Sequence, residues 1–110
     1  MLVLFDQGTP VPIRRHLAHH TVRTAAQQGW ATLGNGELLT AAEFAGFDVF
    51  VTTDKNIRYQ QNLAGRRIAI VVIGHAPWPG LEPHVDRVVA AVNEATPGSY
   101  AEVEIPTPEA

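Results

Sequence analysis

An uninterrupted apolar run, IAIVVI at residues 68–73, constrains the fold of this chain more than any other feature. A strand whose side chains are apolar on both faces has to be covered on both faces, as happens when helices flank a parallel sheet. The runs at 2–5 and 47–53 have a similar apolar character, and residues 21–25 and 99–105 are weaker strand candidates. The sequence therefore predicts a sheet with buried central strands and a half-exposed final strand.

Helical segments alternate with these strands, and they are expected at residues 11–18, 36–45, 55–63 and 82–95. Asn35 is the expected N-cap of the second helix and Gly46 its expected end, while Pro83 suits the first turn of the last helix. The order predicts an α/β fold with a mostly parallel, five-stranded sheet and helices on both faces. Residues 1–105 are expected to form a single domain, followed by a short tail at 106–110.

The composition narrows the classes of function. The chain has 110 residues, no cysteine and a formal net charge of −3. Without cysteine there is no disulfide framework and no thiolate nucleophile, and the chain shows neither a secretion signal nor an apolar run of the roughly 18 residues that suggest a membrane span. A cytoplasmic location is therefore expected. The negative charge argues against binding nucleic acid through a generally basic surface, although the basic residues gather in small clusters.

Two aspartates follow the strongest strands. Asp6 ends the run at 2–5, and Asp54 ends the run at 47–53. The carboxyl ends of parallel strands share one edge of the sheet with the amino ends of the following helices, and ligands bind at this edge. A third acid is expected near a helix N-terminus there, and Glu37 suits that position better than Glu43, which lies about 9 Å further along the helix.

Three converging carboxylates repel one another unless a cation balances their charge. Hard oxygen ligands suit Mg²⁺ or Mn²⁺, and a bound magnesium ion activates water and stabilises charge on a phosphodiester. Asn56, two residues after Asp54, is expected to add a carbonyl oxygen or a water-mediated contact. The sequence thus gives Asp6, Glu37, Asp54 and Asn56 as candidate metal ligands.

The stretches LFDQGTPVPIRRHL and VTTDKN resemble the PIN-like nuclease domains of prokaryotic toxin–antitoxin (VapC-like) systems, over roughly residues 2–73. In short members of that group, an Asp ends the first strand in a D-E-N-L-P-like motif, an acid opens a central helix, and a T-x-D-x-D-like motif follows the next strand. The resemblance implies a PIN-like fold and magnesium-dependent endoribonuclease activity with Asp6, Glu37 and Asp54 as catalytic residues. It also implies the toxin role, a homodimer and a cognate antitoxin.

Two positions depart from the family motifs. Gln7 stands where the first motif often has Glu, and Asn56 stands where the second Asp of the T-x-D-x-D-like motif often lies. An Asp-to-Asn change keeps a ligand oxygen but loses a negative charge, which weakens a magnesium site. These departures favour an alternative function, a catalytically weakened PIN-like module that binds protein or RNA.

Four basic residues near the two strand-end aspartates are the candidate contacts to RNA phosphates: Arg14, Arg15, Lys55 and Arg58. Each has a plainer interpretation as part of a solvated surface. The two aspartates also have a plainer interpretation. Asp54 suits an N-cap that accepts from the amide of Asn56 or Ile57, and Asp6 suits an Asx-turn over Gly8.

A phospho-receiver domain is a competing α/β interpretation, with Asp54 as its phosphoacceptor. Such a domain needs a lysine at the end of a late strand and an acidic pair after the first strand. Lys55 is the only lysine here, and Gln7 follows Asp6. Both observations argue against this interpretation.

Overall fold

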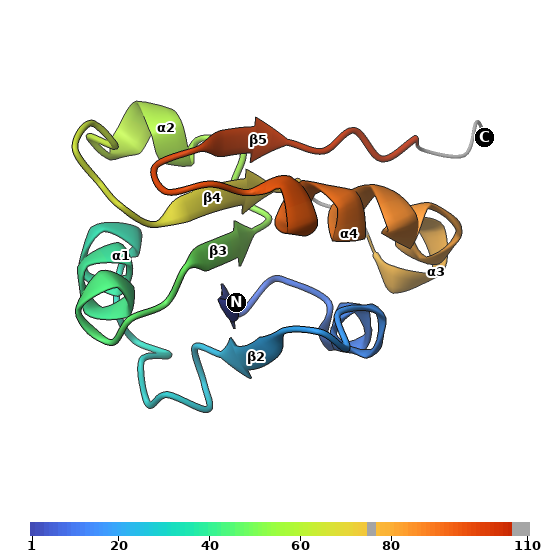
Figure 1. Ribbon diagram of the computed structural model, residues 1–110, viewed down its shortest axis with the longest axis horizontal. Coiled ribbons are helices and arrows are strands. Elements are labelled where there is room, and N and C mark those ends of the chain that lie inside the picture. The colour runs from blue at the N-terminus through green and yellow to red at the C-terminus, as the bar shows by residue number, and fades with distance from the viewer. Residues whose placement is uncertain (75–76, 107–110) are drawn as a thin grey trace.

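A parallel sheet lies at the centre of the computed structural model, which describes residues 1–74 and 77–106 (Figure 1). Its five strands, in the order β2-β1-β3-β4-β5, are β1 (Leu2–Phe5), β2 (Thr21–Thr24), β3 (Val49–Thr52), β4 (Ala69–Val72) and β5 (Tyr100–Glu102). Every neighbouring pair is parallel, and β5 is the half-exposed edge strand that the sequence predicts. The predicted α/β class with a five-stranded parallel sheet is confirmed.

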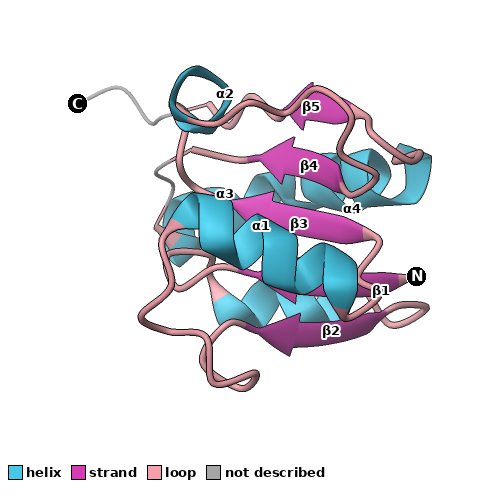
Figure 2. Ribbon diagram, turned by 90° about the vertical axis from the view of Figure 1, so that its left-hand side faces the viewer, coloured by secondary structure: helices cyan, strands magenta, loops and turns pink. Residues whose placement is uncertain are grey.

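Helices cover both faces of the sheet (Figure 2). They are η1 (Val11–His16), α1 (Asn35–Phe44), α2 (Ile57–Gln60), α3 (Trp78–Leu81), η2 (Glu82–His84) and α4 (Val85–Glu94). Helix α1 lies on one face, whereas η1 and α4 lie on the other. Within the described residues, no helix has the length and apolar character needed to cross a membrane.

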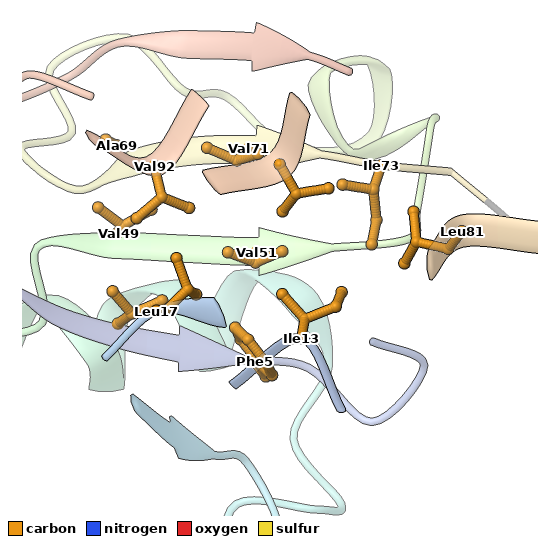
Figure 3. Close-up of a cluster of buried hydrophobic side chains, with 12 residues drawn as sticks. Phe5, Ile13, Leu17, Val49, Val51, Ala69, Val71, Ile73, Leu81 and Val92 are labelled. Atoms are coloured by element: carbon orange, nitrogen blue, oxygen red, sulfur yellow. The ribbon is translucent and has the colours of Figure 1, made fainter. Parts of the chain in front are cut away.

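Side chains alternate across the sheet and divide the core in two. Odd-numbered strand residues such as Val51 and Val71 pack against η1, α3 and α4 (Figure 3). Even-numbered residues such as Leu4 and Phe50 pack against α1. This two-residue period explains why the central strands are apolar throughout, and it also decides on which face a polar residue after a strand emerges.

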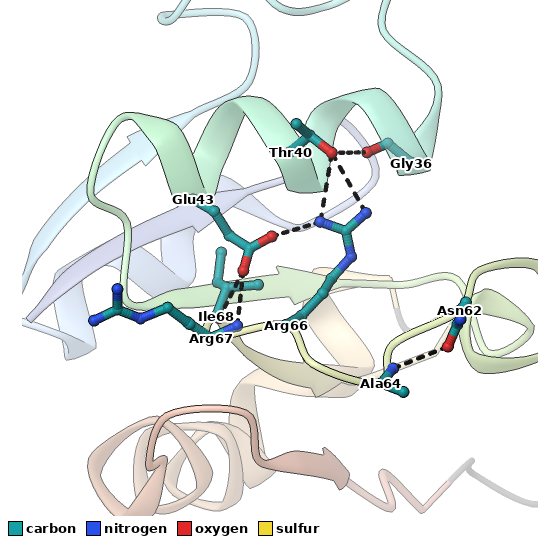
Figure 4. Close-up of polar contacts among 8 residues, drawn as sticks. All are labelled: Gly36, Thr40, Glu43, Asn62, Ala64, Arg66, Arg67 and Ile68. Carbon is teal, nitrogen blue, oxygen red and sulfur yellow. Dashed lines mark hydrogen bonds and ion pairs between the residues drawn. The ribbon is translucent and has the colours of Figure 1, made fainter.

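Several helix boundaries differ from the sequence prediction. The helix expected at 55–63 is reduced to α2, and Asn62 accepts a hydrogen bond from the amide of Ala64 at 3.1 Å (Figure 4), a local turn that competes with helix continuation. The first helix is a 3-10 helix that ends at His16. The last begins at Val85, so Pro83 lies in the preceding η2 and not, as predicted, in the first turn of that helix. Of the predicted tail, residues 107–110 lie outside the described part of the chain.

Both ends of α1 test the sequence prediction. Gly46 follows the helix with a φ of +87°, as its predicted role in ending the helix requires. The N-cap is Gly34 rather than the predicted Asn35, and Asn35 is the first helical residue. Its side-chain amide instead donates to Asp54 Oδ2 at 2.8 Å.

The C-terminal half of α1 is fastened to the chain that enters β4 (Figure 4). Glu43 accepts hydrogen bonds from the Arg66 guanidinium at 2.5 Å and from the Arg67 amide at 2.7 Å, and the Ile68 amide lies at 3.4 Å. Burial raises the pKa of Glu43, but the bonds from Arg67, Arg66 and Ile68 outweigh it and leave the pKa below its ordinary value. Glu43 is therefore a structural anchor between α1 and β4.

Candidate functional site

The strand order points to the loops after β1 and β3. The chain leaves β1 toward β2 on one side, and β3 lies on the other side of β1. This is where the strand order reverses, and in open α/β sheets ligands bind at the carboxyl ends of the strands beside such a point. Asp6 directly follows β1 and Asp54 lies two residues after β3, so both belong to this part of the edge.

Thr52 links the two aspartates. Its side chain has no exposed surface, and its hydroxyl donates to Asp6 Oδ2 at 2.5 Å while accepting from the Asp54 amide at 3.0 Å. The side-chain alternation explains this meeting, because residues 6, 52 and 54 are even-numbered and emerge on the face covered by α1. A single buried hydroxyl therefore fixes the spacing of the two strand ends.

The other carboxylate oxygen of Asp6 is held by Thr9. The Thr9 hydroxyl donates to Asp6 Oδ1 at 2.6 Å and also lies 3.0 Å from the Val51 carbonyl oxygen, and the residue is only 3% exposed. The Asx-turn over Gly8 is not the contact that holds this carboxylate, since both of its oxygens accept from threonine hydroxyls. Asp6 is thus oriented by one residue of its own loop and by one residue of β3.

Asp54 is held at both oxygens as well. Its Oδ1 accepts from the Asn56 amide at 2.9 Å, but Asp54 is not the predicted N-cap, because α2 begins at Ile57 and its N-cap is Asn56. Its Oδ2 accepts from the Asn35 side-chain amide at 2.8 Å. Thr9, Asn35 and Thr52 are the residues supporting this site that the sequence reasoning missed. The even-numbered position of Thr52 beside Asp54 was the signal for one of them.

Glu37 lies apart from this group. It is exposed and lines an open hollow of about 750 Å³ on the outer side of α1, together with Thr40, Phe44 and Arg66. Asp6 lines a separate hollow of about 190 Å³, whose wall includes Gln7 and Asn35. Across residues 1–74 and 77–106, no three side chains of His, Cys, Asp or Glu form a group that could hold a metal ion. The structure brings Asp6 and Asp54 together, but not Glu37.

The residues that do meet offer the oxygen donors that a hard cation prefers. Asp6 and Asp54 supply two half-buried carboxylates, each with lone pairs beyond those used by its hydrogen bonds. Gln7 and Asn35 line the adjoining hollow, and Asn56 lies on the surface beside Asp54. Magnesium is commonly bound through one or two carboxylates together with water and substrate phosphate. Asp6 and Asp54 are therefore the residues that could hold a hard cation here, with water and substrate as further ligands.

The four basic residues expected to contact RNA have different surroundings. Arg14 donates to Gln27 Oε1 at 2.9 Å. Arg58 donates to the Tyr59 hydroxyl at 2.6 Å and pairs with Glu102 at 3.2 Å, and these two contacts raise its pKa. Arg15 is exposed, and the side chain of Lys55 lies against Gly74 at the end of β4. Arg14 and Arg58 therefore already have protein partners.

Comparison with known proteins gives no relative, since no family model, no curated protein and no solved structure matches this chain.

Proposed function

We propose that this chain is a magnesium-dependent ribonuclease of the PIN-like type, acting in the cytoplasm as the toxin of a toxin–antitoxin pair. The observation that carries the proposal is the Asp6–Thr52–Asp54 arrangement at the carboxyl edge between β1 and β3. Two carboxylates from neighbouring strands are oriented there by buried or half-buried polar partners. Such support is typical of carboxylates that bind metal, whose hydrogen-bond partners fix their direction.

In this proposal Asp6 and Asp54 hold the metal ion, with Gln7, Asn35 or Asn56 contributing a carboxamide oxygen directly or through water. A magnesium ion, when bound, would activate a water molecule and neutralise charge on the scissile phosphate. Thr9 and Thr52 orient the carboxylate of Asp6, while the Asn35 side chain and the Asn56 amide orient that of Asp54. Arg15 and Lys55 would contact the RNA backbone, because Arg14 and Arg58 already have protein partners.

Cleavage of single-stranded RNA in Mg²⁺ tests this function, with Asp54→Asn as the main variant. We expect Asp54→Asn to abolish cleavage with little change in thermal midpoint, because the new amide still accepts from the Asn56 amide and the Asn35 side chain can turn over to accept from it. Glu94→Gln removes a charge from an exposed acid at the end of α4 and is the matched control. Cleavage that survives Asp54→Asn would contradict the proposal.

A second candidate is the catalytically weakened PIN-like module that binds RNA or protein. It is favoured by the hydrogen bonds that all four carboxylate oxygens of Asp6 and Asp54 already accept within the chain, and by the separate location of Glu37. A chain of this kind would bind RNA equally well in Mg²⁺ and in EDTA and would leave it intact. The cleavage assay and a binding assay in the two buffers separate the two functions.

Partner proteins also follow from this proposal. A toxin of this type is expected to form a homodimer and to be blocked by its antitoxin. Phe44 is the most exposed large apolar side chain of the described residues, at 97%, and lies beside the hollow on the outer side of α1. Sedimentation of the wild-type chain at several concentrations tests the dimer.

A further inference from the structure

The side chain of Lys55 rests on a glycine at the end of β4. Gly74 is buried and has a φ of +65°, and a Cβ atom built on it would lie 2.2 Å from Lys55 Cε and 3.3 Å from Lys55 Nζ. No side chain could occupy that volume unless the lysine moved. Gly74 therefore provides the space in which the alkyl stem of Lys55 lies.

This contact sets where the ammonium group lies. Lys55 follows β3 and Gly74 follows β4, and these two strands are hydrogen-bonded neighbours. The side chain of Lys55 therefore reaches across from β3 to the end of β4, on the side of β3 away from β1. In the described part of the chain, no carboxylate lies within 4.0 Å of the Lys55 ammonium group, whereas Arg58 and Arg66 both have acidic partners.

We propose that Lys55, supported by Gly74, binds a backbone phosphate of single-stranded RNA beside Asp54 and thereby positions the strand on the site. The inference rests on the proposed ribonuclease function and names the group that holds the substrate. An ammonium on a flexible stem is a compact charge well suited to phosphate, and this one has no carboxylate partner within 4.0 Å among the described residues. Lys55 is a positioning residue in this account, and the carboxylates remain the metal ligands.

Replacement of Gly74 tests the proposal without touching Lys55 itself. In Gly74→Ala the new methyl group displaces the lysine, and the displacement costs little stability because the clashing atom lies near the end of a flexible side chain. The positive φ adds strain of its own, so a matched control is needed. Gly65→Ala supplies it, because Gly65 has a φ of +78° with nothing within 4 Å of the added methyl group.

The measurement is the affinity for a fluorescein-labelled single-stranded oligouridylate in EDTA, as a function of salt, with the thermal midpoint of each variant. We expect Lys55→Ala and Gly74→Ala to weaken binding about fivefold at low salt and to reduce the slope of log K against log salt by about 0.7, the value for one lost phosphate contact. The double variant should bind like Lys55→Ala alone. Gly65→Ala should lower the midpoint as much as Gly74→Ala and bind RNA like the wild type.

Three results would overturn the inference: wild-type affinity and slope in Lys55→Ala, an equal loss of binding in Gly65→Ala and Gly74→Ala, or no RNA binding by the wild-type chain. Because the assay contains EDTA, it does not depend on catalysis. A chain that never cleaves RNA but loses the phosphate contact in both variants would refute the ribonuclease function and leave the Lys55 site standing. A chain that cleaves RNA while both variants bind RNA normally would refute the Lys55 site and leave the ribonuclease function standing.

Discussion

Replacement of Thr52 by valine removes the hydroxyl that joins the two strand-end aspartates while keeping the shape of the side chain. In the wild type this hydroxyl donates to the Asp6 carboxylate at 2.5 Å and accepts from the Asp54 amide at 3.0 Å. A hydrogen bond to a charged group contributes about 1.5–3 kcal/mol, and an amide left unpaired in the interior costs about 1–3 kcal/mol. Asp6 and Asp54 are only half-buried, so water replaces part of both contacts.

We therefore expect Thr52→Val to lower the free energy of unfolding by about 2–3 kcal/mol, which corresponds to a fall of roughly 10 °C in thermal midpoint. Magnesium affinity should fall about 10- to 100-fold, because the Asp6 carboxylate loses one of the partners that orient it. Urea unfolding followed by circular dichroism gives the first quantity, and calorimetric titration of Mg²⁺ gives the second.

Thr52→Ser is the control for packing. It keeps the hydroxyl and loses one buried methyl group, for an expected cost of about 1 kcal/mol with the magnesium affinity retained. If the valine variant proved as stable as the serine variant and bound Mg²⁺ as tightly, the view that Thr52 couples the two aspartates would be refuted.

Three other predictions concern α1 and its contacts. Glu43→Gln should lower stability at pH 7 by about 1–2 kcal/mol, since it weakens the charged bonds to Arg66 and the backbone. The folded-state pKa of Glu43 is lowered, so its contribution to stability is complete above its ordinary pKa of 4.5 and is lost as the pH falls through the folded value. Urea midpoints between pH 6 and pH 3 should therefore fall more steeply for the wild type than for the variant. Leu39→Ala, at a buried position on α1, should lower the free energy of unfolding by about 2–5 kcal/mol. Phe44→Ser, on the exposed side, should change it by less than about 0.5 kcal/mol. Equal urea midpoints for the two variants would contradict the orientation of the helix. Glu37→Gln should bind Mg²⁺ as tightly as the wild type does, because Glu37 lines a separate hollow. A loss of binding in calorimetry would show that Glu37 is a third metal ligand.

The parts of the fold that follow from apolar patterning could be predicted from the sequence. Apolar strands such as 68–73 require cover on both faces, and the alternation with helices then gives a parallel sheet. The same reasoning assigned Asp6 and Asp54 to one edge, because that assignment depends only on strand direction. The hydroxyl of Thr52 joins them there.

Features that depend on tertiary contacts could not be predicted in this way. Asn35 is a residue type that favours the N-cap position, but its side-chain amide donates to Asp54, which lies 19 residues away along the chain. The side of α1 on which Glu37 lies could not be predicted either, because this helix has apolar residues on more than one side, with Leu39 buried and Phe44 exposed. A helix without one clear apolar face does not reveal from its sequence how it is rotated against the sheet.

Calorimetric titration of Mg²⁺ into the wild-type chain, Asp6→Asn and Asp54→Asn tests the central claim most directly. Each substitution keeps the size of the side chain and removes one carboxylate charge. If the two aspartates share one site, the wild type binds a single ion and both variants lose that binding together, while Glu94→Gln retains it. Binding that persists unchanged in either aspartate variant would contradict a shared site at the carboxyl edge of β1 and β3.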